Sequence, residues 1–547
     1  MHPANSKRMQ IKNKGGIFLK KSLAMLFVIM LIVASMAGCT GKKDDGMEIR
    51  YNVGTEPETM DVHLSTGIPE ATIMLQIYEG LTRMDALGQP KAALAKSWDI
   101  SEDKTEYTFH LRESKWANGE TLTAHDLVWS WKRALDPELA ADYAYMLYPI
   151  LGAEAYNAGK GSADDIGIEA VDDLTLKVKL VGPTPYFLSL VSFKTYYPVY
   201  KKNIEADPEG WHLSVETTVG NGPFKMVKWA DNKMEFVPNE HYWDAGAVKA
   251  DRLLFTMVEN ASTELTMFEN GELHMTNTVP GQEIPRLQKM PELKIFPYLG
   301  TYYYIFNLEK PPFDDIRVRK ALTLAIDRQA IVDNVTQGGQ LPAFAFVPPG
   351  IPEPDGSDFR EKGGDYFQED LALAKELLAA AGYPDGEGFP AFEILYNTSE
   401  GHKLIAEAIQ EMWKKNLGIT NVTLTNQEWG IYLNSRDEGA FTVARAGWIG
   451  DYNDPNTFLD MWTTGNGNNN SRFSNAEYDR LVAECLVEGN MNTRNDKLHR
   501  LEDIFMGEMS IMPIYYYTLP AMVSQKLKGY SSIIIGGVDF KTAYITE

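Results

Sequence analysis

Alternating helices and strands in the second half of the chain limit its possible folds more than any other feature. Apolar residues recur at near-helical spacing after Asp315. A second predicted helix, residues 369–381, ends at Gly382, and a third covers residues 403–417. The strand-like segment 422–425 follows. A helix, a short loop and a strand in succession predict an α/β lobe.

The first half of the chain is richer in predicted strands. Apolar and polar residues alternate through residues 107–111 and again through residues 174–180, which indicates half-buried strands. A chain of 547 residues is too long for one hydrophobic core, so we expect about two to four domains. The pattern therefore predicts a mixed α/β protein with more than one lobe.

Charge is distributed unevenly along the chain. Residues 1–38 contain six of the 52 Lys and Arg residues and no Asp or Glu, so the remainder has 46 basic residues against 75 acidic ones. Such an acidic surface repels phosphate backbones and anionic lipid headgroups. We therefore predict no nucleic-acid partner and attribute the acidity to solubility.

The N-terminus has the features of an export signal. Lys20 and Lys21 precede a short apolar run, residues 23–33, which is too short for a typical transmembrane helix. The following Met-Ala-Gly-Cys, residues 36–39, resembles the bacterial lipobox, whose cysteine is acylated after cleavage. An ordinary signal with a chance cysteine is the alternative.

The lipobox implies a lipid-anchored protein on the extracytoplasmic face of the cell membrane. We expect a signal peptide over residues 1–38, lipidation of Cys39, and a tether over residues 39–47. Cys485 is the only other cysteine, and we interpret it as a small buried hydrophobic residue. Without a disulfide, stability must come from large cores.

Sequence motifs of enzymes are missing. The chain has no HExxH, GxSxG, P-loop or paired cysteines at metal spacing, and its nine histidines are scattered. Eleven tryptophans suit a sugar-binding cleft, but no acid/base pair is placed beside them. We therefore predict no catalytic residues, no cofactor and no metal site.

The stretch ARAGWIGDYNDP, residues 444–455, is the first candidate ligand site. Residues 441–444 read as a buried strand, so Arg445, Trp448 and Asp451 are expected where this strand ends and a loop begins. Binding sites are often built at such positions.

Six stretches, in order, carry a resemblance that runs from about Gly54 to Tyr517. They are GTEPETMDVHLSTGIPE (54–70), YTFHLRESKWANGE (107–120), NGPFKMVKW (221–229), NEHYWD (239–244), FNLEKPPFDDIRVRKALTLAIDR (306–328) and ARAGWIGDYNDP. Together they resemble the oligopeptide-binding lipoproteins of ABC peptide importers, which are extracellular solute-binding proteins of the peptide/nickel-binding family.

This resemblance implies a periplasmic-binding-protein fold with two lobes, three domains and two crossing segments as hinge. The expected division is lobe I core, residues 48–77, 204–300 and 517–547; extra domain of lobe I, residues 78–203; and lobe II, residues 301–516. A short peptide is enclosed as an extended strand when the lobes close.

The resemblance also assigns roles within ARAGWIGDYNDP. Asp451 pairs with the peptide α-ammonium, whose burial is costly unless a carboxylate meets it. Gly447 lets the peptide backbone approach, and Trp448 lines a side-chain pocket. Arg445 orients the loop or holds an acidic partner. Without the resemblance, Asp451 would read as the capping residue of an Asx-turn.

Further positions follow from the same resemblance. They are Glu56 and Glu58 on a strand that pairs with the peptide, Tyr143 (or the nearby Tyr145) from the opposing domain, Trp429 as a pocket residue, Arg436 and His402 near the peptide C-terminus, and Tyr517 in the cleft. Two positions depart from the family. Ile449 stands where some members have a disulfide cysteine, and Thr336 where some have a carboxylate-binding lysine.

The resemblance implies a receptor that delivers peptides with a free N-terminus to the subunits of an ABC permease. It is expected to act as a monomer held to the membrane through Cys39. Two alternatives stay open. The same fold binds other solutes, such as dipeptides, signalling peptides, metal chelates or sugars. A protein of another class, an exported hydrolase of peptides or glycans, would show turnover.

Overall fold

The computed structural model of this protein describes residues 46–547. The predicted signal peptide, the lipidation site Cys39 and most of the tether lie outside the described residues. Every element below belongs to one compact unit, Met47–Glu547. Among the described residues, each helix is too short or too polar to cross a bilayer.

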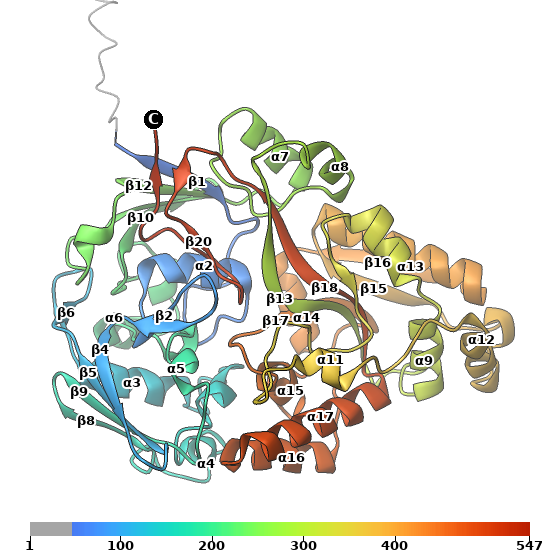
Figure 1. Cartoon of the computed structure of the whole chain (residues 1–547), viewed down its shortest axis with the longest axis horizontal. Coiled ribbons are helices and arrows are strands. Elements are labelled where there is room, and N and C mark those ends of the chain that lie inside the picture. Colours follow the sequence, from blue (N-terminus) through green and yellow to red (C-terminus); the bar gives the residue numbers. More distant parts are fainter. Residues whose placement is uncertain (1–45) are drawn as a thin grey trace, which may run out of the picture. The chain divides into compact units, whose positions relative to one another are not determined.

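Two four-stranded sheets organise the first half of the chain (Figure 1). In the sheet ordered β1-β12-β11-β10, β1 pairs parallel with β12 and the other neighbours pair antiparallel. The sheet ordered β4-β5-β9-β8 is antiparallel throughout. Their strands are β1 (Glu48–Asn52), β4 (Ala95–Ile100), β5 (Glu106–Leu111), β8 (Ile168–Asp172), β9 (Thr175–Lys179), β10 (Phe224–Ala230), β11 (Lys233–Pro238) and β12 (Arg252–Thr256).

Further helices and short strands complete this half. The helices are α2 (Ile68–Ile77), α3 (Ala124–Ala134), α4 (Ala153–Asn157), α5 (Phe187–Leu190), α6 (Lys201–Ala206), α7 (Ala261–Glu269) and α8 (Ile284–Leu287). The short strands are β2 (Thr82–Met84), β3 (Pro90–Ala92), β6 (Ser114–Lys115) and β7 (Thr121–Leu122). Four more come from the C-terminal segment, β19 (Leu527–Lys528), β20 (Ser531–Ser532), β21 (Val538–Asp539) and β22 (Tyr544–Ile545).

The second half is built on a six-stranded mixed sheet with the order β14-β18-β13-β17-β15-β16. Its strands are β13 (Leu293–Phe306), β14 (Leu341–Pro342), β15 (Phe392–Asn397), β16 (Val422–Gln427), β17 (Val443–Ile449) and β18 (Ile511–Met522). The helices are α9 (Ile316–Leu324), α10 (Arg328–Ile331), α11 (Phe359–Gly363), α12 (Leu371–Ala380), α13 (Glu400–Leu417), α14 (Trp429–Asp437), α15 (Asn456–Leu459), α16 (Ala476–Val487) and α17 (Met491–Glu508).

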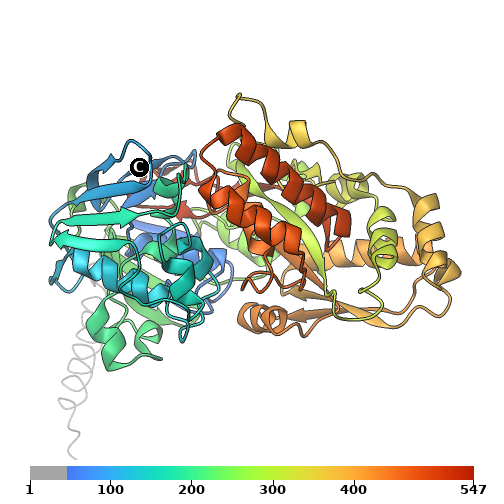
Figure 2. The same cartoon turned by 90° about the horizontal axis from the view of Figure 1, so that it is seen from below.

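Two long strands, β13 and β18, connect the halves (Figures 1 and 2). They pair antiparallel, with Leu293 opposite Met522. Met512, near the start of β18, packs into the core of the second half, whereas Ala521, near its end, packs into the core of the first. The protein is therefore a two-lobed mixed α/β protein, as predicted. The exact domain boundaries stay a prediction.

The two lobes also pack against each other. One apolar cluster contains Phe109 and Trp131 from the first lobe and Trp462 from the second. Tyr186 of the first lobe stacks on Tyr452 of the second, with ring centroids 4.4 Å apart and planes inclined by 6°. Such contacts are expected when a two-lobed protein has closed.

The predicted long helix after Asp315 is broken into pieces. Asp315 caps α9 by accepting a hydrogen bond from the Arg317 amide. A second cap, Asp327, accepts from the Ala330 amide at 2.8 Å and starts α10, which continues into a π-helical turn. Cys485 on α16 is 2% exposed, so the prediction of a buried hydrophobic residue is confirmed.

Candidate functional site

Two cavities between the lobes share part of their lining and form one cleft. The Asp451 pocket has a volume of about 1170 Å³ and the Arg445 pocket about 1160 Å³. Ile68 of the first lobe and Trp429 and Gly447 of the second line both. A cleft with walls from both lobes is where closure would enclose a ligand.

Strand β17 carries most of the candidate stretch to the cleft. The sequence predicted a strand that ends at residue 444, but β17 continues to Ile449 because its backbone pairs with β13 as far as Gly300. Arg445 and Trp448 therefore lie on the strand, and the prediction that they lie in a loop is wrong. Asp451 alone lies just beyond the strand end.

The Asp451 carboxylate is buried with little compensation. Asp451 is 8% exposed, and its Oδ2 accepts one hydrogen bond from Oγ1 of Thr457 at 3.2 Å. Burial raises the pKa of Asp451 to about 7, although Lys194 and the Thr457 hydroxyl act in the opposite direction. Within residues 46–547, no Lys or Arg nitrogen lies within 4.0 Å of this carboxylate. It can accept a cationic ligand group.

Lys194 faces this carboxylate from the first lobe and was not identified from the sequence. It is 4% exposed, and its Nζ lies 4.9 Å from the centroid of the Tyr143 ring and 4.6 Å from that of Phe193. Burial lowers the pKa of Lys194 to about 8, against the attraction of Asp451 and Glu70. A signal was available, because Lys194 is the only charged residue in the segment 180–200.

Aromatic residues from both lobes form the walls of the Asp451 pocket. The rings of Tyr143 and Trp448 stack across the cleft with centroids 6.2 Å apart, and Nε1 of Trp448 donates to the Thr457 carbonyl at 2.7 Å. Tyr145 lines a different cavity, with Asp460. The structure thus places Tyr143 rather than Tyr145 beside the candidate site.

Arg436 also lines the Asp451 pocket, and it does not line the pocket of Arg445 and His402. Its Nε donates to Oδ1 of Asn470 at 3.1 Å. Arg436 is thus held on the same side of the cleft as Asp451, so the two residues predicted near the peptide tail, Arg436 and His402, lie in different pockets.

The Arg445 pocket contains a half-buried arginine without an acidic partner within 4.0 Å in the described chain. Nη2 of Arg445 donates to the Tyr517 hydroxyl at 2.7 Å, and Nη1 to Oδ1 of Asn397 at 3.3 Å. The guanidinium carbon lies 4.7 Å from the centroid of the Tyr302 ring, and Nε has no hydrogen-bond partner among the described residues. This arrangement can receive an anion such as a carboxylate.

His402 lies beside Arg445 at the start of α13. Its Nδ1 is 3.3 Å from the Tyr302 hydroxyl oxygen. Burial and the nearby Arg445 hold the pKa of His402 well below its ordinary value, so the imidazole is neutral at pH 7. The groups here that can attract an anion are Arg445 and the N-terminus of α13, which Ser399 caps, while Glu259 and Glu264 also line this pocket.

Trp429 links the pockets to a third cavity at the rim, the Glu58 pocket, whose volume is about 1080 Å³. Nε1 of Trp429 donates to Oε1 of Glu70 at 3.2 Å, and the Glu58 amide donates to the same oxygen at 2.7 Å. Glu56 also lines this rim pocket. Residues 56–58 form no strand here, because β1 ends at Asn52 and no neighbouring segment pairs with them.

Gly447 is required by a contact within the protein. A Cβ atom at this position would lie 2.3 Å from the Tyr517 hydroxyl oxygen and 3.2 Å from Nη2 of Arg445. Because Gly447 has no side chain, the Tyr517 hydroxyl can accept a hydrogen bond from Arg445 beside this position of β17.

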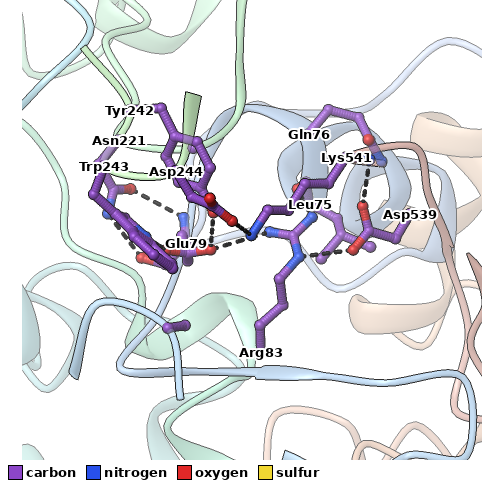
Figure 3. A network of polar contacts seen from close by, with 12 residues as sticks. Leu75, Gln76, Glu79, Arg83, Asn221, Tyr242, Trp243, Asp244, Asp539 and Lys541 are labelled. Carbon is purple, nitrogen blue, oxygen red and sulfur yellow. Dashed lines mark hydrogen bonds and ion pairs between the residues drawn. The ribbon is translucent and has the colours of Figure 1, made fainter. Parts of the chain in front are cut away.

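A buried polar network fixes the wall of the Asp451 pocket (Figure 3). Arg83 donates from Nε to Oδ2 of Asp539 at 2.7 Å and from Nη2 to the Leu75 carbonyl at 2.9 Å. Glu79 accepts from the Tyr242 hydroxyl at 2.5 Å. These contacts join α2, β2 and the C-terminal segment, so Arg83 has a structural role.

The two departures from the family lie in different places. Ile449 lines both pockets of the cleft, whereas Thr336 donates to Oε1 of Gln340 at 3.0 Å and lines neither. In the described part of the chain, no group of three or more His, Cys, Asp or Glu side chains is arranged to hold a metal ion.

Comparisons with known proteins agree with this architecture. The family model for bacterial extracellular solute-binding proteins, family 5 Middle, matches residues 89–470. The oligopeptide-binding protein OppA of Bacillus subtilis (strain 168) is 39% identical over 542 residues, which cover 96% of this chain and 98% of that protein.

Two solved structures differ in how well they superpose. The crystal structure of Haemophilus influenzae OppA in complex with RPPGFSPFR has a TM-score of 0.86 at 35% identity, covering 92% of this chain and 100% of that one. The unliganded open form of the murein tripeptide-binding protein MppA has a TM-score of 0.61 at 36% identity, and the match covers 92% of this chain and 98% of that one. Since the identities are nearly equal, the lobes of this protein are arranged as in the complex.

Proposed function

Because the chain belongs to the bacterial extracellular solute-binding proteins of family 5, we propose that it is an extracytoplasmic receptor for short peptides that delivers them to an ABC permease. The observation that carries this proposal is the Asp451 carboxylate, which is buried, lines the cleft between the lobes and has no cationic partner within 4.0 Å in the described chain. A peptide α-ammonium supplies the missing charge.

The peptide lies along the cleft, with its N-terminus at Asp451 and its C-terminal side toward Arg445. Between them, Gly447 and Trp429 line both pockets, so one extended ligand passes these residues. Trp448 and Tyr143 border the first side chain. The unpaired Nε of Arg445 and the start of α13 attract the terminal carboxylate, which favours this role for Arg445 over a loop-orienting one.

Recognition through the two termini and the backbone explains how one cleft accepts many sequences. The receptor performs no chemistry and uses no cofactor. It acts as a monomer anchored by lipid on Cys39, and the outer faces of both lobes meet the permease subunits. Glu56 and Glu58 lie at the rim, where their backbone would pair with the extended ligand.

Calorimetry on the chain from residue 40 onward tests this function. The protein is unfolded and refolded to remove bound ligand, then titrated with a pool of tri- to hexapeptides. We expect saturable binding, and mass spectrometry should recover the bound peptides intact. Cleaved peptides would identify a hydrolase, and absence of binding would contradict a peptide receptor.

A further inference from the structure

Lys194 is a buried cation without a direct partner in the cleft. It lines the Asp451 pocket and is 4% exposed. In residues 46–547, its Nζ makes no hydrogen bond and has no carboxylate oxygen within 4.0 Å. The ring faces of Tyr143 and Phe193 attract the positive charge, but they do not replace hydrogen-bond acceptors for the three N–H groups of the ammonium. An ammonium in a buried residue costs free energy unless a ligand supplies hydrogen-bond acceptors or a negative charge.

The other cations of this pocket are occupied. Arg83 forms an ion pair with Asp539 at 2.7 Å, and Arg436 donates to Asn470. The lining of the pocket contains three cations, Arg83, Lys194 and Arg436, and two carboxylates, Asp437 and Asp451. Since Asp539 neutralises Arg83, two cations and two carboxylates of the lining remain, and Lys194 is the cation among them whose nitrogen makes no hydrogen bond in the described chain.

Binding of a peptide changes this balance of charges. The α-ammonium of the ligand pairs with Asp451, which is the carboxylate that attracts Lys194 most strongly. Glu70, the second carboxylate near Lys194, accepts hydrogen bonds at Oε1 from the Glu58 amide and Trp429, and its Oε2 has no partner among the described residues. Burial raises the pKa of Glu70, which weakens it as a partner for Lys194. Two ammonium groups then share one pocket, which costs free energy at low dielectric unless an anion joins them.

We propose that Lys194 is a specificity-determining residue that selects peptides with an acidic first side chain. The ligand α-ammonium pairs with Asp451 while the side-chain carboxylate of the same residue pairs with Lys194. This inference rests on the proposed function and names the preferred class of ligand, peptides that begin with Asp or Glu.

The covalent geometry of an acidic residue fits this arrangement. In Asp and Glu the α-nitrogen and the side-chain carboxylate are separated by about 3–5 Å. Lys194 and Asp451 line the same pocket from opposite lobes, each affects the pKa of the other, and the gap of more than 4.0 Å between their charged atoms leaves room for ligand atoms. The two ion pairs would also hold the lobes together.

Three tripeptides measure the preference in the unmodified protein. Glu-Ala-Ala, Gln-Ala-Ala and Lys-Ala-Ala differ in first-residue charge at similar size. We expect Glu-Ala-Ala to bind at least about tenfold more tightly than Gln-Ala-Ala, and Lys-Ala-Ala to bind least tightly. Moving the acidic residue, as in Ala-Glu-Ala, should remove the gain, since only the first side chain lies beside Lys194.

Variants then assign the preference to Lys194. Lys194→Met keeps the length of the side chain, and its Glu-to-Gln affinity ratio should fall to about one. Lys202→Met is the matched control, because Lys202 is an exposed lysine paired with Glu120, and it should keep the wild-type ratio. Circular dichroism verifies folding, and Lys194→Glu, which should favour Lys-Ala-Ala, provides a second variant.

The outcomes separate the two proposals. If none of the peptides binds, the proposed function is wrong. If the unmodified protein binds Glu-Ala-Ala and Gln-Ala-Ala equally, peptide binding stands and the role of Lys194 is refuted, whether or not the variants fold. A preference that survives in Lys194→Met would assign it to another residue and also refute the role of Lys194.

Discussion

Individual buried charges distinguish the site from the rest of the protein. Elsewhere buried arginines have acidic partners, as in the pairs of Arg133 with Asp61 at 2.6 Å and Arg360 with Glu502 at 2.7 Å. In the cleft, Asp451, Lys194 and Arg445 have no oppositely charged side chain within 4.0 Å in the described chain. Because an unpaired buried charge is costly, these groups are explained by a ligand that completes them.

Removal of the Asp451 charge tests this explanation at a single residue. Asp451→Asn should weaken the binding of free peptides by about 2–5 kcal/mol, since the ligand ammonium is then buried without a counter-ion. Asp164→Asn, at an exposed aspartate on the first lobe, should leave affinity unchanged. The affinity for one tripeptide is measured by calorimetry on the unmodified protein and on both variants. A normal affinity in Asp451→Asn would show that Asp451 does not hold the peptide ammonium.

The raised pKa of Asp451 gives peptide binding a pH dependence. Only the ionised carboxylate pairs with an ammonium, and in the ligand-free protein its pKa is about 7. Affinity should therefore fall as the pH drops through this value, by up to tenfold per unit at lower pH, and it should fall again above about pH 8, where the ligand α-amino group loses its proton. Titrations between about pH 5 and pH 8 measure this acidic limb. The limb should disappear in Asp451→Asn; a flat profile in the unmodified protein would contradict the assignment.

Helices and strands of the second half could be predicted because their signals are local. The spacing of apolar residues identified α13, which is followed by the C-cap Gly418 with a left-handed φ of 73°. Strand β17 was predicted too short, since its length depends on pairing with β13, which no local pattern shows. Likewise, Lys194 and Asp451 are 257 residues apart in sequence, and only the arrangement of the lobes brings them together.

The C-cap Gly418 allows the stability of helix α13 to be tested separately from peptide binding. A Cβ atom there would lie 2.1 Å from the Asp385 carbonyl oxygen, so Gly418→Ala should lower the free energy of unfolding by about 1–3 kcal/mol. Gly507→Ala, in α17, meets no atom within 4 Å and should stabilise by up to about 1 kcal/mol. Urea denaturation measures both, and peptide affinity should not change. An unchanged stability in Gly418→Ala would contradict the tight C-cap.

At the scale of the whole molecule, the closed arrangement brings together charges that repel or lack partners. Glu58 of the first lobe has its pKa raised to about 7 by burial, by Glu70 and by Asp437 of the second lobe. Asp142 has its pKa raised to about 7 by burial and by Asp437. These costs favour opening of the ligand-free protein, and a bound peptide supplies contacts that offset them.

Small-angle X-ray scattering follows this equilibrium. The ligand-free protein at pH 8 should have a larger radius of gyration than the closed structure, and saturating tripeptide should reduce it. Asp451→Asn at the same peptide concentration should stay open, because the ligand is bound weakly. A ligand-free protein that is already closed at pH 8 would show that the buried charges do not oppose closure.

The most direct test of the central claim compares one peptide in two forms. Tri-alanine with a free N-terminus and N-acetyl-tri-alanine differ in the α-ammonium, the group assigned to Asp451. Calorimetry on the ligand-stripped protein should show saturable binding of the free peptide and at least about 100-fold weaker binding of the acetylated one. Equal affinities would mean that the ammonium is not the anchor and that Asp451 does not hold the peptide N-terminus.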